Sequence, residues 1–295
     1  MTKELNKKSS NWLRLFQFFG IWILANIASY LILVIPFYSE TIGITMEEYE
    51  RMGADDPLFT LLIYVSISVA TLISFWFVKQ KVEKESIDKF FKWNPRGFFT
   101  GSGLGFILIL LCCLLMFAFN LVKPEYHSLK NLPFLILVFM LVAITEEIMF
   151  RGYILNNLTE KLSKNLAIIL SSLIFAAFHF GNPHFGLIGF VNIFLSGALM
   201  AIVYLNSKDL WVPIGVHFTW NLTQAVLGFA VSGRNDTGVF TLNYLSTSHY
   251  LTGGEFGIEG SLIVTVLTLI AIASCKLIPT QILSYKPLGT DQRKQ

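Results

Sequence analysis

The chain has 295 residues, of which 54% are hydrophobic and only 14% are charged, and this composition excludes an ordinary soluble domain. The formal net charge of +3 is small and the basic residues are scattered, so we expect no nucleic-acid partner. The three cysteines fit neither a disulfide framework nor a metal-ligand spacing. The sequence therefore predicts an all-α, polytopic membrane protein.

Eight apolar segments approach the roughly 20 residues that a helix needs to cross a hydrocarbon core of about 30 Å. In chain order they are residues 12–37, 58–78, 103–122, 132–158, 166–180, 185–205, 210–231 and 258–277. The first is too long for a cleaved signal and leads directly into further apolar segments, so we expect it to be retained as a helix. No linker or repeat divides the chain, and we expect residues 1–295 to form a single membrane domain of eight transmembrane helices.

The hydrophilic segments between these spans alternate in charge, as the positive-inside rule requires. Basic residues occur in the N-terminus, in residues 79–96, in the turns at Lys161 and Lys208 and in the C-terminal tail. The opposite side receives the acidic residues 40–56 and the Ser/Thr/Gly-rich residues 232–257, which we expect to be a surface loop. We therefore predict that both termini are cytosolic, and that residues 79–96 form a short amphipathic surface helix.

Three charged side chains lie inside the fourth span: Glu146, Glu147 and Arg151. Ionisable groups at bilayer depth are costly and are rare unless they are paired, hydrated or functional. On a helix Glu147 and Arg151 lie four residues apart and can form an ion pair, whereas Glu146 points about 100° away. We interpret Glu147 and Arg151 as a supporting pair and Glu146 as the functional carboxylate.

Three further polar residues fall inside later spans. With a helical rise of 1.5 Å per residue, depth can be counted from the end of each span on the basic side of the membrane. The depths are about 18 Å for Glu146, about 20 Å for His179, about 11 Å for His217 and about 17 Å for Asn221. Each of the last three alone could be a hydrogen-bonding contact between helices. Packing does not require four such groups in one layer, so the sequence predicts an intramembrane polar site.

The residue types indicate hydrolysis, with two alternatives for how the water is activated. A buried carboxylate beside an imidazole can take a proton from water, and His217 with Asn221 offers donors for an oxyanion from one helical face. Alternatively, Glu146, His179 and His217 are three acceptable zinc ligands that leave a fourth position for water. The His-Glu-x-x-His signature of common zinc proteases is absent from the sequence.

The pattern of these residues resembles the CAAX prenyl protease and bacteriocin-processing (CPBP, Abi) family of intramembrane endopeptidases. The resemblance covers residues 132–225 and rests on four motifs, Glu146-Glu147-x-x-x-Arg151, Phe175-x-x-x-His179, Phe194-x-x-Gly197 and His217-x-x-x-Asn221. Ala201, where the family usually has glycine, and Lys208-Asp209, where small residues are common, depart from the pattern in packing and turn positions.

The resemblance implies an eight-helix endopeptidase with its catalytic core at about residues 132–225. By similarity, Glu146 and His179 activate the water, His217 and Asn221 form the oxyanion site, and Phe175 supports them. The resemblance implies no required cofactor. The family has also been described as metalloproteases, so zinc remains the alternative.

The expected partners are membrane lipid and a peptide or membrane-protein substrate, and the expected location is a bacterial cytoplasmic membrane. A non-enzymatic bacteriocin-immunity or regulatory membrane protein is a second interpretation, which the complete set of four polar groups disfavours. A transporter or proton relay is a third, and the lack of an inverted repeat disfavours it.

Overall fold

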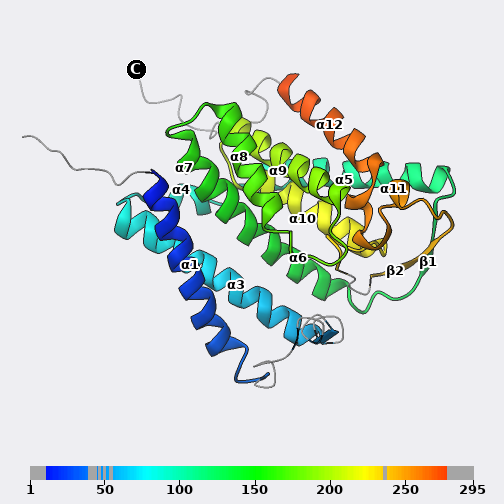
Figure 1. Ribbon diagram of the computed structural model, residues 1–295, viewed down its shortest axis with the longest axis horizontal. Helices are drawn as coiled ribbons and strands as arrows, with labels where there is room; N and C mark the ends of the chain where they lie inside the picture. The colour runs from blue at the N-terminus through cyan, green and yellow to red at the C-terminus, as the bar shows by residue number, and fades with distance from the viewer. Residues whose placement is uncertain are drawn as a thin grey trace, which may run out of the picture.

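The computed structural model describes residues 11–38, 45, 48, 51–52, 56–234 and 238–277. Its main helices are α1 (Asn11–Leu33), α3 (Pro57–Phe77), α5 (Pro95–Ala118), α6 (Leu132–Glu147), α8 (Lys164–Ala177), α9 (Leu187–Ser207), α10 (Trp211–Val226) and α12 (Leu262–Leu277) (Figure 1). The chain ends and most of the acidic residues 40–56, on which part of the topology prediction depends, lie outside the described residues.

Each of the eight predicted spans overlaps one of these helices. Among the described residues, five helical segments are long and apolar enough to cross a membrane: Trp12–Leu33, Pro57–Val82, Pro95–Ala118, Leu132–Thr159 and Leu187–Ser207. Helices α8 and α12 are shorter but apolar, and α10 carries two of the predicted site residues. The structure confirms an all-α polytopic membrane protein, while the count of eight crossings stays a prediction.

The third span begins earlier than predicted, because a capping residue fixes its start. Asn94 accepts a hydrogen bond from the backbone N–H of Gly97, and Pro95 occupies the first helical position, where a missing N–H costs nothing. The predicted surface helix at residues 79–96 was wrong in extent. This stretch instead contains the π-helical turn η2 (Val78–Val82), which continues α3, and the short helix α4 (Asp88–Phe91).

The fourth span changes its helical geometry just after the two glutamates. Helix α6 ends at Glu147 and continues as the π-helix η3 (Ile148–Leu155) and the short helix α7 (Asn156–Thr159). Wide turns of this kind are rare and are frequently found at functional sites. Arg151 lies in η3, so the geometry of this wide turn sets the position of its guanidinium group.

Helix α10 lies inside the bundle, packed against α5, α6 and α9 (Figure 1). Its approach to α5 depends on small residues, as is common between membrane helices. A Cβ atom on Gly101 would lie 1.9 Å from the carbonyl oxygen of Val212, and one on Gly215 would lie 2.2 Å from that of Phe98. Only glycine permits this backbone approach, which fixes α10 and its polar residues at the centre.

Helices α1 and α3 pack against each other at the edge of the bundle, and α3 also packs against α6 (Figure 1). Helix α1 exposes large apolar side chains such as Leu24 and Ile32, which are 68% and 69% exposed. An apolar surface of this kind is stable when it faces lipid.

Residues 238–257 contain regular secondary structure, which the expected surface loop did not include. Strand β2 (Phe240–Tyr244) pairs antiparallel with β1 (Val122–Tyr126), so that Val122 lies opposite Tyr244. The short helices α11 (His249–Thr252), η4 (Gly254–Phe256) and η5 (Ile258–Gly260) then lead into α12. This two-stranded sheet therefore ties the segment to the connection between α5 and α6.

Candidate active site

The four predicted catalytic side chains line one cavity of about 270 Å³. Glu146 comes from α6, His179 follows the end of α8, and His217 lies on α10. Asn221 lies one helical turn after His217, on the same face of α10. The structure thus brings together four residues that are spread over 76 positions of the sequence, counting from 146 to 221.

Glu147 is the centre of a buried hydrogen-bond network beside this cavity. Its Oε1 atom accepts a hydrogen bond from Nη1 of Arg151 at 2.7 Å, which is the intrahelical pair that the sequence spacing predicted. The same oxygen accepts a second one from Nδ1 of His217 at 2.9 Å. The link from Glu147 to His217 was not predicted, and it joins α6 to α10.

The bond to Glu147 determines which nitrogen of His217 faces the cavity. Because Nδ1 donates to a carboxylate, Nε2 is the nitrogen left on the other side of the ring. It lies 3.8 Å from Oε2 of Glu146. Glu147 therefore orients the imidazole, and Glu146 is the carboxylate that faces its outer nitrogen.

Glu146 differs from Glu147 in its surroundings. The Glu147 side chain is fully buried, whereas that of Glu146 is 28% exposed and borders the cavity. Oε2 of each glutamate is buried and has no hydrogen-bond partner among the residues that the structure describes, but only Glu146 is among the residues that line the cavity. A buried carboxylate oxygen in this position is suited to accept a hydrogen bond from a water molecule or a substrate group.

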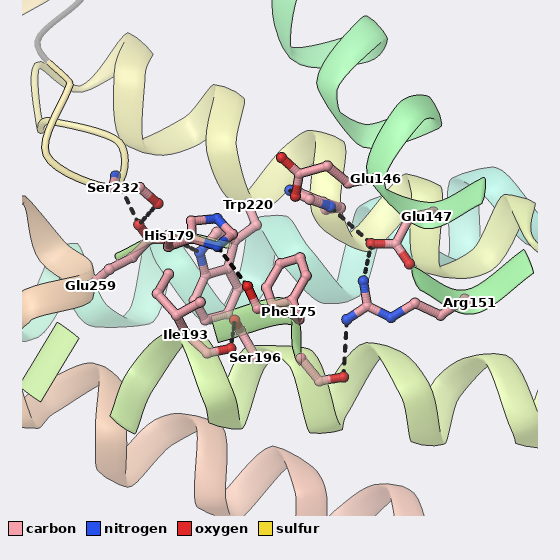
Figure 2. Close-up of polar contacts among 12 residues, drawn as sticks. Glu146, Glu147, Arg151, Phe175, His179, Ile193, Ser196, Trp220, Ser232 and Glu259 are labelled. Carbon is pink, nitrogen blue, oxygen red and sulfur yellow. Dashed lines mark hydrogen bonds and ion pairs between the residues drawn. The ribbon is translucent and has the colours of Figure 1, made fainter. Parts of the chain in front are cut away.

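His179 is oriented by the backbone of its own helix. Its Nδ1 atom lies 2.9 Å from the carbonyl oxygen of Phe175. A carbonyl can only accept, so Nδ1 carries the proton and Nε2 of the neutral ring is the free acceptor. His179 thus offers a hydrogen-bond acceptor to the cavity, where Figure 2 shows it between Glu146 and Glu259 in this view.

Phe175 and Gly197 surround the buried guanidinium group of Arg151. The ring of Phe175 lies 4.7 Å from Cζ of Arg151 and packs against both site histidines. The carbonyl oxygen of Gly197 accepts from Nη2 of Arg151 at 3.0 Å. A side chain at Gly197 would meet Phe175 at 3.1 Å, so the glycine lets α9 approach α8 closely. These contacts support the cavity wall behind the two histidines.

Glu259 is a cavity residue that the sequence analysis missed. It is buried, and its Oε1 accepts from Nε1 of Trp220 at 2.9 Å and from Nε2 of Gln224 at 3.4 Å. Its Oε2 accepts from both the backbone N–H and the hydroxyl of Ser232, at 2.9 and 2.7 Å (Figure 2). Glu259 therefore binds α10 to the start of the segment 232–257, on the wall of the same cavity.

The alternative zinc site would use Glu146, His179 and His217. In the part of the chain that the structure describes, no group of three or more His, Cys, Asp or Glu side chains is arranged to hold a metal ion. Nδ1 of His217 is bonded to Glu147, which leaves Nε2 on the cavity side, 3.8 Å from Glu146. That no metal is required stays a prediction.

The chain resembles known membrane peptidases in the region that builds this cavity. The family described as "Type II CAAX prenyl endopeptidase Rce1-like" matches residues 128–223. This match agrees with the resemblance that the motifs indicated. The matched residues include the glutamates of α6, both site histidines and Asn221.

Two proteins of Bacillus subtilis (strain 168) are similar to the chain. "Putative membrane peptidase YdiL" is 26% identical over 189 residues, which cover 60% of this chain and 74% of that protein. "Uncharacterized protein YpbD" is 29% identical over 97 residues, which cover 33% of this chain and 47% of that protein. No solved structure matches the chain. The comparisons support a membrane peptidase at the level of the family.

Proposed function

We propose that this protein is an intramembrane endopeptidase that hydrolyses a peptide bond with a water molecule activated by Glu146 and His179. The observation that carries the proposal is that four polar side chains of the family motifs line one cavity between apolar helices. Packing alone does not require this arrangement, because polar groups at bilayer depth are costly.

The proposed reaction begins with a water molecule between Glu146 and His179. The carboxylate of Glu146 accepts a proton from the water, while Nε2 of His179 accepts its second hydrogen bond and orients it. The oxygen of the water attacks the carbonyl carbon of the scissile peptide bond and forms a tetrahedral intermediate. When the intermediate collapses, Glu146 returns the proton to the leaving amine, and the new carboxylate and amine are released.

His217 and Asn221 stabilise the negative oxygen of the intermediate. The amide group of Asn221 is a donor in every protonation state. His217 can donate from Nε2 only when both ring nitrogens carry protons, because Nδ1–H is already donated to Glu147. The negative charge of Glu147 offsets the positive charge of that imidazolium, which gives the buried carboxylate a role in orienting and charging His217.

The proposal is tested with the purified full chain in lipid nanodiscs and a mixture of synthetic peptides, with mass spectrometry of the products. In water labelled with ¹⁸O, each new C-terminus should carry the label, because hydrolysis takes one oxygen from solvent. Glu146→Gln should abolish cleavage, and Glu125→Gln, the same change at an exposed position, should not. Unlabelled products, or equal cleavage by Glu146→Gln, would contradict the mechanism.

A further inference from the structure

Among the described residues, the connections that line the cavity all lie at one end of the helix bundle. Among the described residues that line it, those outside the long helices are Phe178, His179 and Asn182, between α8 and α9, and residues 231, 232, 234 and 259, between α10 and α12. No lining residue comes from the connections 78–94, 160–163 or 208–210 at the other end. Asn221 lies only about 8 Å along the helix axis from the end of α10 at Val226. The cavity thus extends from mid-bundle to one surface.

Contacts between the connections show that each end of the bundle is a single surface. At the cavity end, β1 pairs with β2, and Nδ1 of His184 lies 3.0 Å from Oε2 of Glu255. At the other end, Arg14 pairs with Glu160 at 3.2 Å, and Nε1 of Trp211 donates to the carbonyl oxygen of Lys92 at 3.0 Å. The connections therefore divide into two groups without ambiguity.

The two ends differ in their content of basic residues. The end away from the cavity has seven in its connections: Lys79, Lys81, Lys84, Lys89, Lys92, Lys161 and Lys208. The corresponding connections at the cavity end have four: Arg51, Lys123, Lys130 and Arg234. Short connections rich in lysine and arginine remain on the cytosolic side of a membrane. The basic end is therefore the cytosolic end, and the cavity lies toward the opposite face.

We propose that the cavity opens on the extracytoplasmic face of the membrane, and that its substrate is an exported or membrane-anchored polypeptide whose scissile bond lies near that face. That the polypeptide is a substrate rests on the proposed peptidase function. The direction in which the cavity opens does not depend on catalysis. Under this proposal a cytosolic peptide is not the direct substrate, because no described residue from the connections at the basic end lines the cavity.

The experiment uses single cysteines and a membrane-impermeant maleimide on intact bacterial cells that produce the full chain. The positions are Asn182→Cys in the cavity, Tyr250→Cys on exposed α11, and Lys161→Cys at the exposed basic end. The unaltered chain is the blank, since Cys112, Cys113 and Cys275 are buried. Asn182→Cys and Tyr250→Cys should react in intact cells, and Lys161→Cys should react only after permeabilisation.

The reverse pattern, or reaction of Asn182→Cys only after permeabilisation, would overturn the proposal. If a cysteine variant does not accumulate, the unaltered chain still gives an answer, because a protease added outside spheroplasts should cut the exposed residues 245–250. Their protection from external protease, with cutting after lysis, would contradict the outward opening. The same labelling is expected with Glu146→Gln, so a correct orientation without any cleavage would count against the proposed peptidase alone.

Discussion

His217 is hydrogen-bonded through Nδ1 to Glu147, at 2.9 Å, and faces Glu146 only through its other nitrogen, at 3.8 Å. The two adjacent glutamates therefore act on opposite sides of one imidazole ring. Glu147 holds the ring from the buried side, and Glu146 meets it from the cavity. This relationship separates a positioning carboxylate from the proposed base, and the two should fail in different ways when they are substituted.

Glu147→Gln should lower stability, because it leaves Arg151 buried without its counter-charge. Breaking a buried ion pair costs about 3–5 kcal/mol in soluble proteins. Replacing Arg151 by glutamine as well removes the unpaired charge and should restore part of the loss. Thermal unfolding of wild type, the single variant and the Glu147/Arg151 double variant in the same nanodisc is the measurement.

The activity of that double variant provides a second readout. Restored folding should not restore the full cleavage rate, because an uncharged group at position 147 no longer offsets the charge of a doubly protonated His217. A double variant that is both stable and as active as wild type would show that Glu147 serves only to neutralise Arg151.

Asn221→Ala should lower kcat while leaving KM nearly unchanged. The amide is proposed to bind the oxyanion, which exists only in the transition state and the intermediate. Removal of one such donor costs about 10²–10³ in kcat in a well-studied protease. Steady-state kinetics on the peptide of the mixture that is cleaved best measures the effects on kcat and KM separately. A rise in KM at unchanged kcat would assign Asn221 to substrate binding instead.

Glu259→Ala should change substrate binding in the cavity more than the rate of the chemical step. The change removes the acceptor for Trp220, Gln224 and Ser232, so the cavity wall between α10 and the outer segment should loosen. We expect a higher KM and a lower unfolding temperature, with kcat changed less than in Asn221→Ala. Glu125→Ala, at an exposed position of β1, is the matched control and should change neither. Unchanged KM and stability in Glu259→Ala would contradict this role.

Cleavage is predicted to proceed without an added divalent metal. The basis is that Glu146 with His179, and His217 with Asn221, supply a base and oxyanion donors directly. The test combines elemental analysis of the purified protein with activity after chelation. Stoichiometric zinc, with activity lost to the chelator and regained on adding zinc, would make Glu146, His179 and His217 ligands instead.

Hydropathy located the helices well, because lipid demands long apolar segments, and the helical rise placed four polar groups at a common depth. The bond between Glu147 and His217 could not be predicted, since it depends on how α6 and α10 are rotated toward each other. Glu259 was missed because it lies at the start of an apolar segment, where a single carboxylate is typical of a helix end. Strand β1 was missed because its partner lies more than one hundred residues away.

The most direct measurement of the central claim compares the membrane and surface proteomes of cells that naturally make this protein with those of cells carrying Glu146→Gln. Glu146→Gln keeps the shape and hydrogen bonding of the side chain but removes a base, which is worth about 10²–10⁴ in rate. The variant should therefore accumulate to wild-type levels, while at least one membrane or exported protein stays uncut and its newly formed termini disappear. Identical termini in the two strains, with the variant present at wild-type abundance, would contradict a Glu146-dependent peptidase.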